Sequence, residues 1–183
     1  MIRTPAQCPC LGISEPQSHR HAGMVSRLIP VVDRTHLPRT AIFARATAAT
    51  VSPYPPERRL TAAQLARYLD RRAFAVVGST RADGRPHAAL SSYVRRDATF
   101  WLPTAAGSVR ERNLRGTPWL TMVIAEGDHG EHIVVIVEGP AEVIATAGVA
   151  ADVRSAVPGD WVDAWIRLAA GRLMSYAAEG ARF

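Results

Sequence analysis

A short segment near the middle of the chain combines side chains that suit the binding of a phosphate group. Residues 101–114 read WLPTAAGSVRERNL, which predicts the end of a strand, a loop of small residues and then a helix. Ser108 followed by Glu111 forms a capping box, a pattern that starts helices. The first amides of a helix lack intrahelical acceptors and, together with the positive end of the helix, favour an anion.

Three side chains of this segment can contact the same anion. Thr104 and Ser108 offer hydroxyl donors, and Arg110 offers a bidentate, charge-assisted contact. The alternative interpretation is that Ser108 only caps the helix, while Arg110 and Arg112 are solvated. The segment alone leaves both interpretations open.

The flanking sequence predicts that this helix is inserted into a series of antiparallel strands. Asp83-Gly84 is a strong signal for a hairpin turn between strands at 74–80 and 87–94. Further strands are expected at 98–102, 119–125 and 131–145, with a bulge or bend at Gly139-Pro140. Residues 172–176 are either a last strand or more helix. Strands of this number and length, joined mainly by tight turns, favour a small closed or partly closed barrel.

Two further helices are expected around these strands. The first follows Thr61, a suitable N-cap, and runs to about Arg71 with four apolar residues on one face: Leu60, Leu65, Tyr68 and Leu69. The second starts at Pro158-Gly159 and carries three apolar residues on one face, a spacing typical of core packing: Trp161, Trp165 and Leu168.

The basic character of the chain belongs to its first third. All 22 basic residues are Arg, and the net charge is +6. Residues 1–59 hold 8 Arg against 3 acidic residues, whereas residues 60–183 hold 14 Arg against 13 acidic residues. A nucleic-acid-binding barrel would interleave basic and aromatic residues on its surface. The near-neutral balance of residues 60–183 therefore argues against a nucleic-acid partner.

Residues 1–59 show no sustained hydrophobic period and are broken by prolines. We expect them to be a disordered extension or a wrongly assigned start, although their composition also fits a transit peptide. Cys8 and Cys10 are expected to be incidental thiols rather than half of a metal site, because no second ligand pair accompanies them. Residues 60–183 form the expected domain, which contains no cysteine and no membrane-spanning apolar run. These features predict a soluble, cytoplasmic protein without a metal.

The order of the motifs resembles the pyridoxamine-phosphate-oxidase-like family of FMN-binding split barrels. The matching features are the DGRPH hairpin at 83–87, the strand after it, the T-x3-S-x-R-x-RNL pattern at 104–114 and a Pro-led strand at 118. The resemblance covers about residues 60–145 in order and spacing. It implies a mainly β fold with inserted helices, a six-stranded antiparallel split β-barrel. It also implies a homodimer that binds FMN, or a related deazaflavin, between its subunits.

The resemblance assigns roles to individual residues. The residues that would hold the flavin phosphate or lie near it are Thr104, Ser108, Arg110, Arg112 and Asn113. The second strand, with His87 and Ser91, would lie along the isoalloxazine ring. His87 would donate a proton or contact the ring, or would simply be a half-exposed strand residue beside a turn. His129 and His132 are expected in a solvated loop rather than as a metal pair.

Two departures from the family pattern bear on the reaction. Arg110 stands where the family often has Lys. The arginine keeps the positive charge of lysine but not its shape. The second strand has no basic residue beyond His87, and the C-terminal segment is short, which argues against oxidation of pyridoxamine phosphate itself.

The implied function is that of an FMN-dependent oxidoreductase acting on a small organic substrate, with the flavin supplying the redox chemistry. No catalytic residue is identified. One alternative is a deazaflavin-dependent reductase, whose longer acidic cofactor tail would use Arg110, Arg112 and Arg115. Another alternative is a flavin- or haem-binding protein without catalytic activity.

Overall fold

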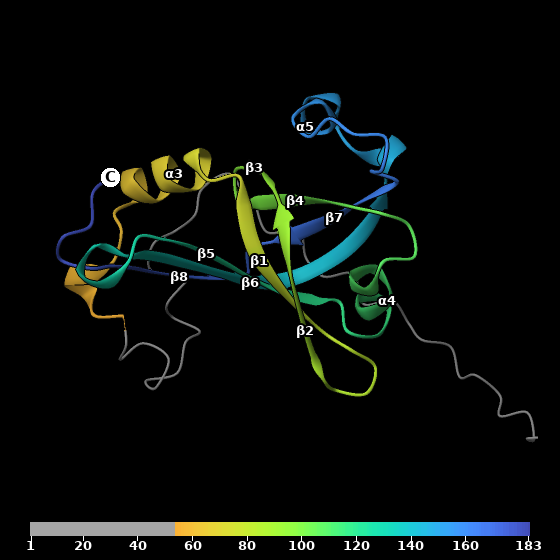
Figure 1. Cartoon of the computed structure of the whole chain (residues 1–183). Coiled ribbons are helices and arrows are strands. Elements are labelled where there is room, and N and C mark those ends of the chain that lie inside the picture. The colour runs from red at the N-terminus through yellow and green to blue at the C-terminus, as the bar shows by residue number, and fades with distance from the viewer. Residues whose placement is uncertain (1–53) are drawn as a thin grey trace, which may run out of the picture. The chain divides into compact units, whose positions relative to one another are not determined.

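The computed structural model describes residues 54–183. In this range an eight-stranded antiparallel sheet curls into a half-barrel (Figure 1). The strands are β1 (Phe74–Thr80), β2 (Pro86–Ser92), β3 (Val94–Arg96), β4 (Thr99–Thr104), β5 (Trp119–Glu126), β6 (Ile133–Ala145), β7 (Ala164–Ala169) and β8 (Arg172–Ala177). The α-helices are α3 (Ala62–Arg71), α4 (Val109–Gly116) and α5 (Ala151–Ser155), and the 3-10 helices are Pro56–Arg58, His129–Glu131 and Thr146–Gly148. The expected split-barrel fold, mainly β with inserted helices, is confirmed. The expectations for Cys8 and Cys10 lie outside the described residues.

The long strand β6 joins the two halves of the sheet. The strand order is β2-β1-β5-β6-β7-β4-β3, and β8 also pairs with β6. Residues 133–138 of β6 pair with β8, whereas residues 141–145 pair with β7. The change of partner falls at Gly139-Pro140, as the sequence predicts, and Figure 1 shows β6 curving along its length. A Cβ atom on Gly139 would lie 1.9 Å from the Ala169 carbonyl oxygen, so this crossing requires glycine.

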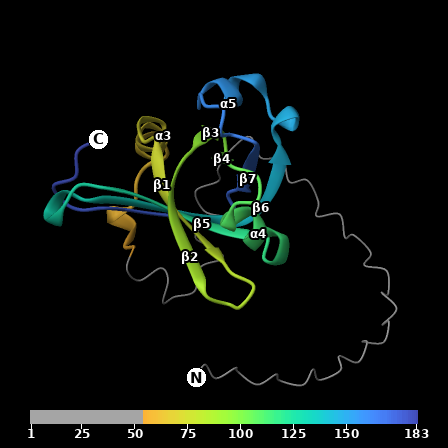
Figure 2. The ribbon, with the colours of Figure 1, turned by 45° about the vertical axis from the view of Figure 1, so that its right-hand side comes forward.

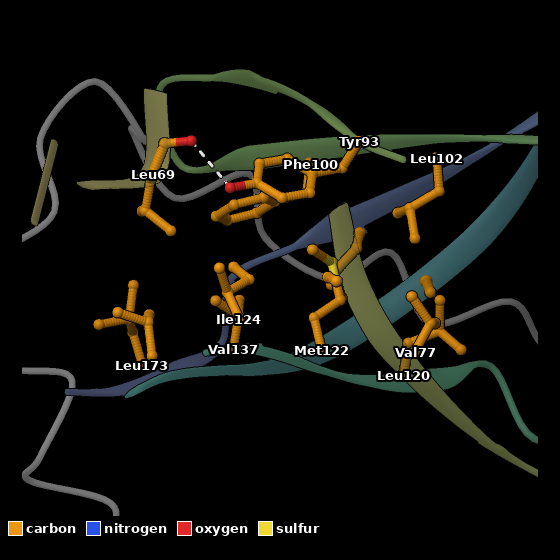
Figure 3. Packing of buried hydrophobic residues seen from close by; sticks show 14 of the residues in the cluster. Leu69, Val77, Tyr93, Phe100, Leu102, Leu120, Met122, Ile124, Val137 and Leu173 are labelled. Atoms are coloured by element: carbon orange, nitrogen blue, oxygen red, sulfur yellow. Dashed lines mark hydrogen bonds between the residues drawn. The ribbon is translucent and has the colours of Figure 1, made fainter. Parts of the chain in front are cut away.

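The main core lies inside the curl of the sheet (Figure 3). Alternate residues of β1, β5 and β6 face it, because side chains of a strand alternate between the two faces of a sheet. Tyr93 separates β2 from β3 and turns into this core, where its hydroxyl donates to the Leu69 carbonyl at 2.8 Å. The single strand expected at 87–94 is therefore divided into β2 and the start of β3.

The expected helix at 61–71 is confirmed as α3. The Thr61 side chain accepts a hydrogen bond from the Gln64 amide, and the Gln64 side chain accepts one from the Thr61 amide. Tyr68 and Leu69 are buried against the sheet. Figure 2 shows α3 and α4 at separate places along the sheet, so α3 lies apart from the segment 101–114 that suits a phosphate.

The prediction of a helix from Pro158 to Leu168 is wrong. This segment ends in β7, which lies between β4 and β6. Trp165 is buried in a second, smaller cluster, Leu168 is buried in the main core, and Trp161 is exposed. Both faces of β7 are covered at residues 164–166, where Trp165 and Ile166 pack in different clusters, whereas Arg167 is exposed. The apolar residues therefore do not alternate, and their spacing does not distinguish a strand from a helix. The segment at 172–176, left open by the sequence, is strand β8, and β3 and β7 bring the strand count above the expected six.

Among residues 54–183 the structure contains no helix long and apolar enough to cross a membrane.

Candidate functional site at the start of helix α4

The end of β4 and the start of α4 are joined by two hydroxyl groups. Thr104 is the last residue of β4 and is buried, and its Oγ1 lies 2.8 Å from Ser108 Oγ. Ser108 is the N-cap of α4, and its Oγ accepts a hydrogen bond from the Glu111 amide at 3.2 Å. The structure therefore brings Thr104 and Ser108 together, as the sequence predicts, and confirms Ser108 as the cap.

Arg110 lies in the first turn of α4 and forms no ion pair with any residue of the range 54–183. Its Nη1 atom is buried, and in the described part of the chain no hydrogen bond or ion pair satisfies it. Burial lowers the pKa of the Arg110 guanidinium because desolvation disfavours the charged form. Because buried cationic groups are normally paired, the unsatisfied Nη1 marks a place where an anionic group would fit.

The small-residue loop before α4 offers fewer free amides than the sequence suggested. The Ala106 amide donates to the Asp163 carboxylate at 3.1 Å, and the Gly107 amide donates to the Glu111 carboxylate. The Glu111 side chain thus binds Gly107 instead of completing the capping box on Ser108. The amides that remain for an anion are those of Val109 and Arg110, which begin α4 and lack intrahelical acceptors.

Arg112 and Asn113 differ in their surroundings. Arg112 is exposed, and its Nη1 donates to the Gly107 carbonyl, so its charge is directed at the loop. Asn113 is buried, and its Nδ2 donates to Ser79 Oγ of β1 at 2.9 Å. Ser79 Oγ is also 3.5 Å from Nδ1 of His87, its cross-strand partner in β2. Asn113 and His87 are therefore connected through Ser79.

Ser79 is the site residue that sequence reasoning missed. It is buried, yet it occupies the inward-facing position that follows Ala75 and Val77 along β1. The signal in the sequence is a polar residue at a position where the preceding inward-facing residues of the strand are apolar. A buried hydroxyl requires a hydrogen-bond partner, so such a residue indicates a polar neighbour.

Ser91 lies apart from the α4 site. It faces the same side of β2 as His87, four residues farther along, which corresponds to roughly 13 Å of extended strand. Its hydroxyl donates to the neighbouring Ser92 carbonyl at 3.0 Å. The structure thus groups His87 with the α4 residues and leaves Ser91 toward the other end of β2.

The histidines of the 129–132 turn form a local contact. His132 Nδ1 lies 2.6 Å from the His129 carbonyl oxygen, and the His132 ring stacks on Tyr176. Across residues 54–183, no cluster of three or more His, Cys, Asp or Glu side chains is arranged to hold a metal ion.

The residues at the start of α4 fit a phosphate-bearing cofactor. Between the end of β4 and the first turn of α4 lie two linked hydroxyls, two helix amides without intrahelical acceptors and the Arg110 guanidinium, whose buried Nη1 has no partner within residues 54–183. The guanidinium and the two amides can donate to an anion, and because one of the two hydroxyls donates to the other, the pair has one hydroxyl hydrogen left to donate. A phosphate accepts several hydrogen bonds at once. The ion pairs formed by neighbouring arginines do not involve Arg110; Arg115, for example, pairs with Glu111.

A comparison with protein families places most of the described chain in one of them. Residues 61–182 match the model of the family described as pyridoxamine 5'-phosphate oxidase. Among curated proteins, none matches the sequence.

Solved structures with the same fold are distant in sequence. A conserved hypothetical protein from Mycobacterium tuberculosis is 21% identical, with 69% of this chain and 91% of that chain covered and a TM-score of 0.59. An FAD-binding protein from Mycobacterium smegmatis is 21% identical, with 68% and 99% covered and a TM-score of 0.53. HutZ, the haem storage protein of Vibrio cholerae, is 12% identical, with 65% and 97% covered and a TM-score of 0.55. At these identities the similarity shows a shared fold.

Proposed function

The chain belongs to the pyridoxamine 5'-phosphate oxidase family, and we propose that it binds FMN through the start of α4 and acts as a flavin-dependent oxidoreductase on a small organic substrate. The observation that carries this proposal is the buried Nη1 of Arg110, which has no partner among residues 54–183. A phosphate group would supply the missing anion. The same-fold protein of Mycobacterium smegmatis binds FAD, which supports a flavin as the cofactor.

The geometry of this segment supports a specific set of proposed phosphate contacts. Arg110 would provide the charge, Thr104 and Ser108 would provide hydroxyls, and the Val109 and Arg110 amides would donate from the helix end. The flavin, when bound, supplies hydride or electron transfer, and the protein supplies position and electrostatics. His87, tied to Asn113 through Ser79, would contact the ring.

The arrangement of the other arginines favours FMN over a deazaflavin with a longer acidic tail. That alternative needs more cations near Arg110. Arg112 already donates to the Gly107 carbonyl, and Arg115 already pairs with Glu111. Of these three residues, only Arg110 has no hydrogen-bond or ion-pair partner in the described part of the chain.

We further propose that the protein works as a homodimer, as the exposed face of the sheet suggests. Large apolar side chains lie exposed on the outer face of neighbouring strands: Phe74 and Val76 on β1, Leu90 on β2 and Trp119 on β5. We call these four residues the outer apolar face. Val76 is the direct cross-strand partner of Leu90, so the exposed groups are contiguous there. Patches of this kind mark interaction sites, and a symmetric second copy is the commonest partner.

The first experiment is to purify the full chain without added cofactor and record its visible spectrum. Mass analysis of the material released on denaturation identifies any flavin or haem. The apoprotein is then titrated with FMN, riboflavin and a deazaflavin. Tight FMN binding with much weaker riboflavin binding is the expected result, because riboflavin lacks the phosphate. Equal affinity for the two, or no flavin binding at all, would overturn the assignment of the α4 site.

A second measurement separates catalysis from storage. The flavin-loaded protein is mixed with NADH, NADPH or a reduced deazaflavin without oxygen, and bleaching of the flavin absorbance is followed. Reduction by one of these donors is expected of an oxidoreductase. A bound flavin that none of them reduces would support the storage or sensing alternative instead.

A further inference from the structure

Ser79 lies between two residues of the proposed site that come from different elements. It is only 7% exposed and belongs to β1, while Asn113 belongs to α4 and His87 to β2. Ser79 and His87 are cross-strand partners, so their side chains face the same side of the sheet. The Ser79 hydroxyl is the only side chain that the structure shows hydrogen-bonded to Asn113 within residues 54–183.

The donors and acceptors of these contacts are consistent with a direction that runs from Asn113 through Ser79 to His87. Asn113 Nδ2 donates to Ser79 Oγ at 2.9 Å, so the Ser79 oxygen is an acceptor in that bond. Its own hydrogen is then free to be donated elsewhere. The nearby acceptor is Nδ1 of His87 at 3.5 Å, a long hydrogen bond. If Nδ1 of a neutral histidine accepts a hydrogen bond, its proton is on Nε2.

We propose that Ser79 is a positioning residue which, held by Asn113, keeps neutral His87 in the tautomer that carries its proton on Nε2. His87 then offers a hydrogen-bond donor to an acceptor atom of the flavin ring, a ring nitrogen or carbonyl oxygen. The role of the tautomer toward flavin rests on the proposed function. The tautomer itself is a property of the protein without cofactor and is measured there.

The test uses nitrogen NMR of the uniformly ¹⁵N-labelled full chain without flavin, at a pH where His87 is neutral. Nitrogen shifts distinguish a protonated from an unprotonated imidazole nitrogen, and loss of a signal in His87→Gln assigns His87. His132 is the internal reference for the opposite tautomer, because its Nδ1 lies 2.6 Å from the His129 carbonyl and must donate. The wild-type His87 is expected to show protonated Nε2 and unprotonated Nδ1.

Free histidine also prefers the Nε2 proton, so the decisive variant is Asn113→Asp. An ionised aspartate only accepts hydrogen bonds, so Ser79 must donate to it and can no longer donate to His87. The Ser79 oxygen then accepts from His87, and the His87 proton should move to Nδ1. Ser79→Ala should release the tautomer and give averaged shifts, while His132 stays unchanged in both variants. Circular dichroism and the amide spectrum show whether each variant is folded.

Two outcomes would overturn the proposal. One is a folded Asn113→Asp protein in which His87 keeps its proton on Nε2. The other, which applies even if Asn113→Asp does not fold, is a folded Ser79→Ala protein with His87 shifts equal to those of the wild type. Failure of the flavin titration described above would remove the proposed function without changing either result.

With flavin bound, Ser79→Ala and His87→Leu should shift the flavin midpoint potential in the same direction, whereas His87→Gln, which keeps a donor, should restore it in part.

Discussion

The Oγ1 atom of Thr104 lies 2.8 Å from the Oγ atom of Ser108, and this pair connects the last residue of β4 to the N-cap of α4. Thr104 is almost fully buried, at 1% exposed, so its hydroxyl depends on Ser108 for a partner. The same two hydroxyls are the ones proposed to contact the cofactor phosphate. A substitution at Ser108 therefore changes the stability of the helix start and the affinity for the cofactor, and the two effects must be separated.

Ser108→Asp separates helix capping from phosphate binding. Aspartate caps helices about as well as serine, so the free energy of unfolding should stay close to the wild-type value. Ser108→Ala should lose about 1 kcal/mol of stability, measured by urea denaturation. The added negative charge should weaken FMN binding at least about tenfold, because it opposes the phosphate. Riboflavin, which has no phosphate, is the control ligand and should bind Ser108→Asp as it binds the wild type.

Arg110→Ala should weaken FMN binding by about 1.5–3 kcal/mol, the range for a hydrogen bond to a charged group. Arg112→Ala is the matched control, because Arg112 is exposed and its side chain is directed at the Gly107 carbonyl. Its effect on FMN affinity should be much smaller. Isothermal titration or quenching of flavin fluorescence measures both. Equal affinities for Arg110→Ala and wild type, in a folded protein, would mean that the phosphate is held elsewhere.

Leu90→Asp should weaken dimerisation. Leu90 is 67% exposed and is the most exposed member of the outer apolar face. Burying a leucine side chain contributes about 1.5–3 kcal/mol, so the dimer dissociation constant should rise at least about tenfold. Analytical ultracentrifugation measures it. Ala151→Asp, at an exposed position of α5, is the control and should leave the dimer intact. A wild-type chain that stays monomeric at high concentration would contradict the proposed homodimer.

The unfolding free energy should fall as the pH rises above about 10, because two buried tyrosines resist ionisation in the folded protein. Burial raises the pKa of Tyr68 to about 12, and burial also raises the pKa of Tyr93. A group whose folded pKa is raised contributes stability that is fully present below its unfolded pKa, near 10, and is lost as the pH rises through the folded value.

Tyr93→Phe and Tyr68→Phe test this dependence. Each variant should reduce the slope of unfolding free energy against pH between about 10 and 12, measured by urea denaturation at several pH values. Tyr93→Phe should also cost about 1 kcal/mol at neutral pH, because the Leu69 carbonyl loses its donor. A slope that neither variant changes would show that other groups control stability at high pH.

Local signals in the sequence determined much of this structure. Thr61 and Ser108 start helices because their side-chain oxygens accept hydrogen bonds from free amides in the first turn. Asp83-Gly84 forms a hairpin turn because Gly84 adopts a φ of 82°. The strands expected at 74–80, 119–125 and 131–145 are present as β1, β5 and β6. The bend at Gly139-Pro140 was also predictable, since both residues disfavour a regular central strand. These features depend on neighbours within a few residues, and the chain itself specifies them.

Other features depended on contacts between distant segments. The segment around Trp165 is a strand because β4 and β6 cover its two edges, and an apolar run buried on both faces carries no period that distinguishes it from a helix. The link from Asn113 through Ser79 to His87 joins three elements, and the Ala106 amide is occupied by Asp163, 57 residues later in the chain. The sequence alone could indicate that Arg110 is a candidate phosphate ligand. Only the tertiary structure decided that its Nη1 is buried with no partner among residues 54–183, because burial depends on residues that the fold brings around it.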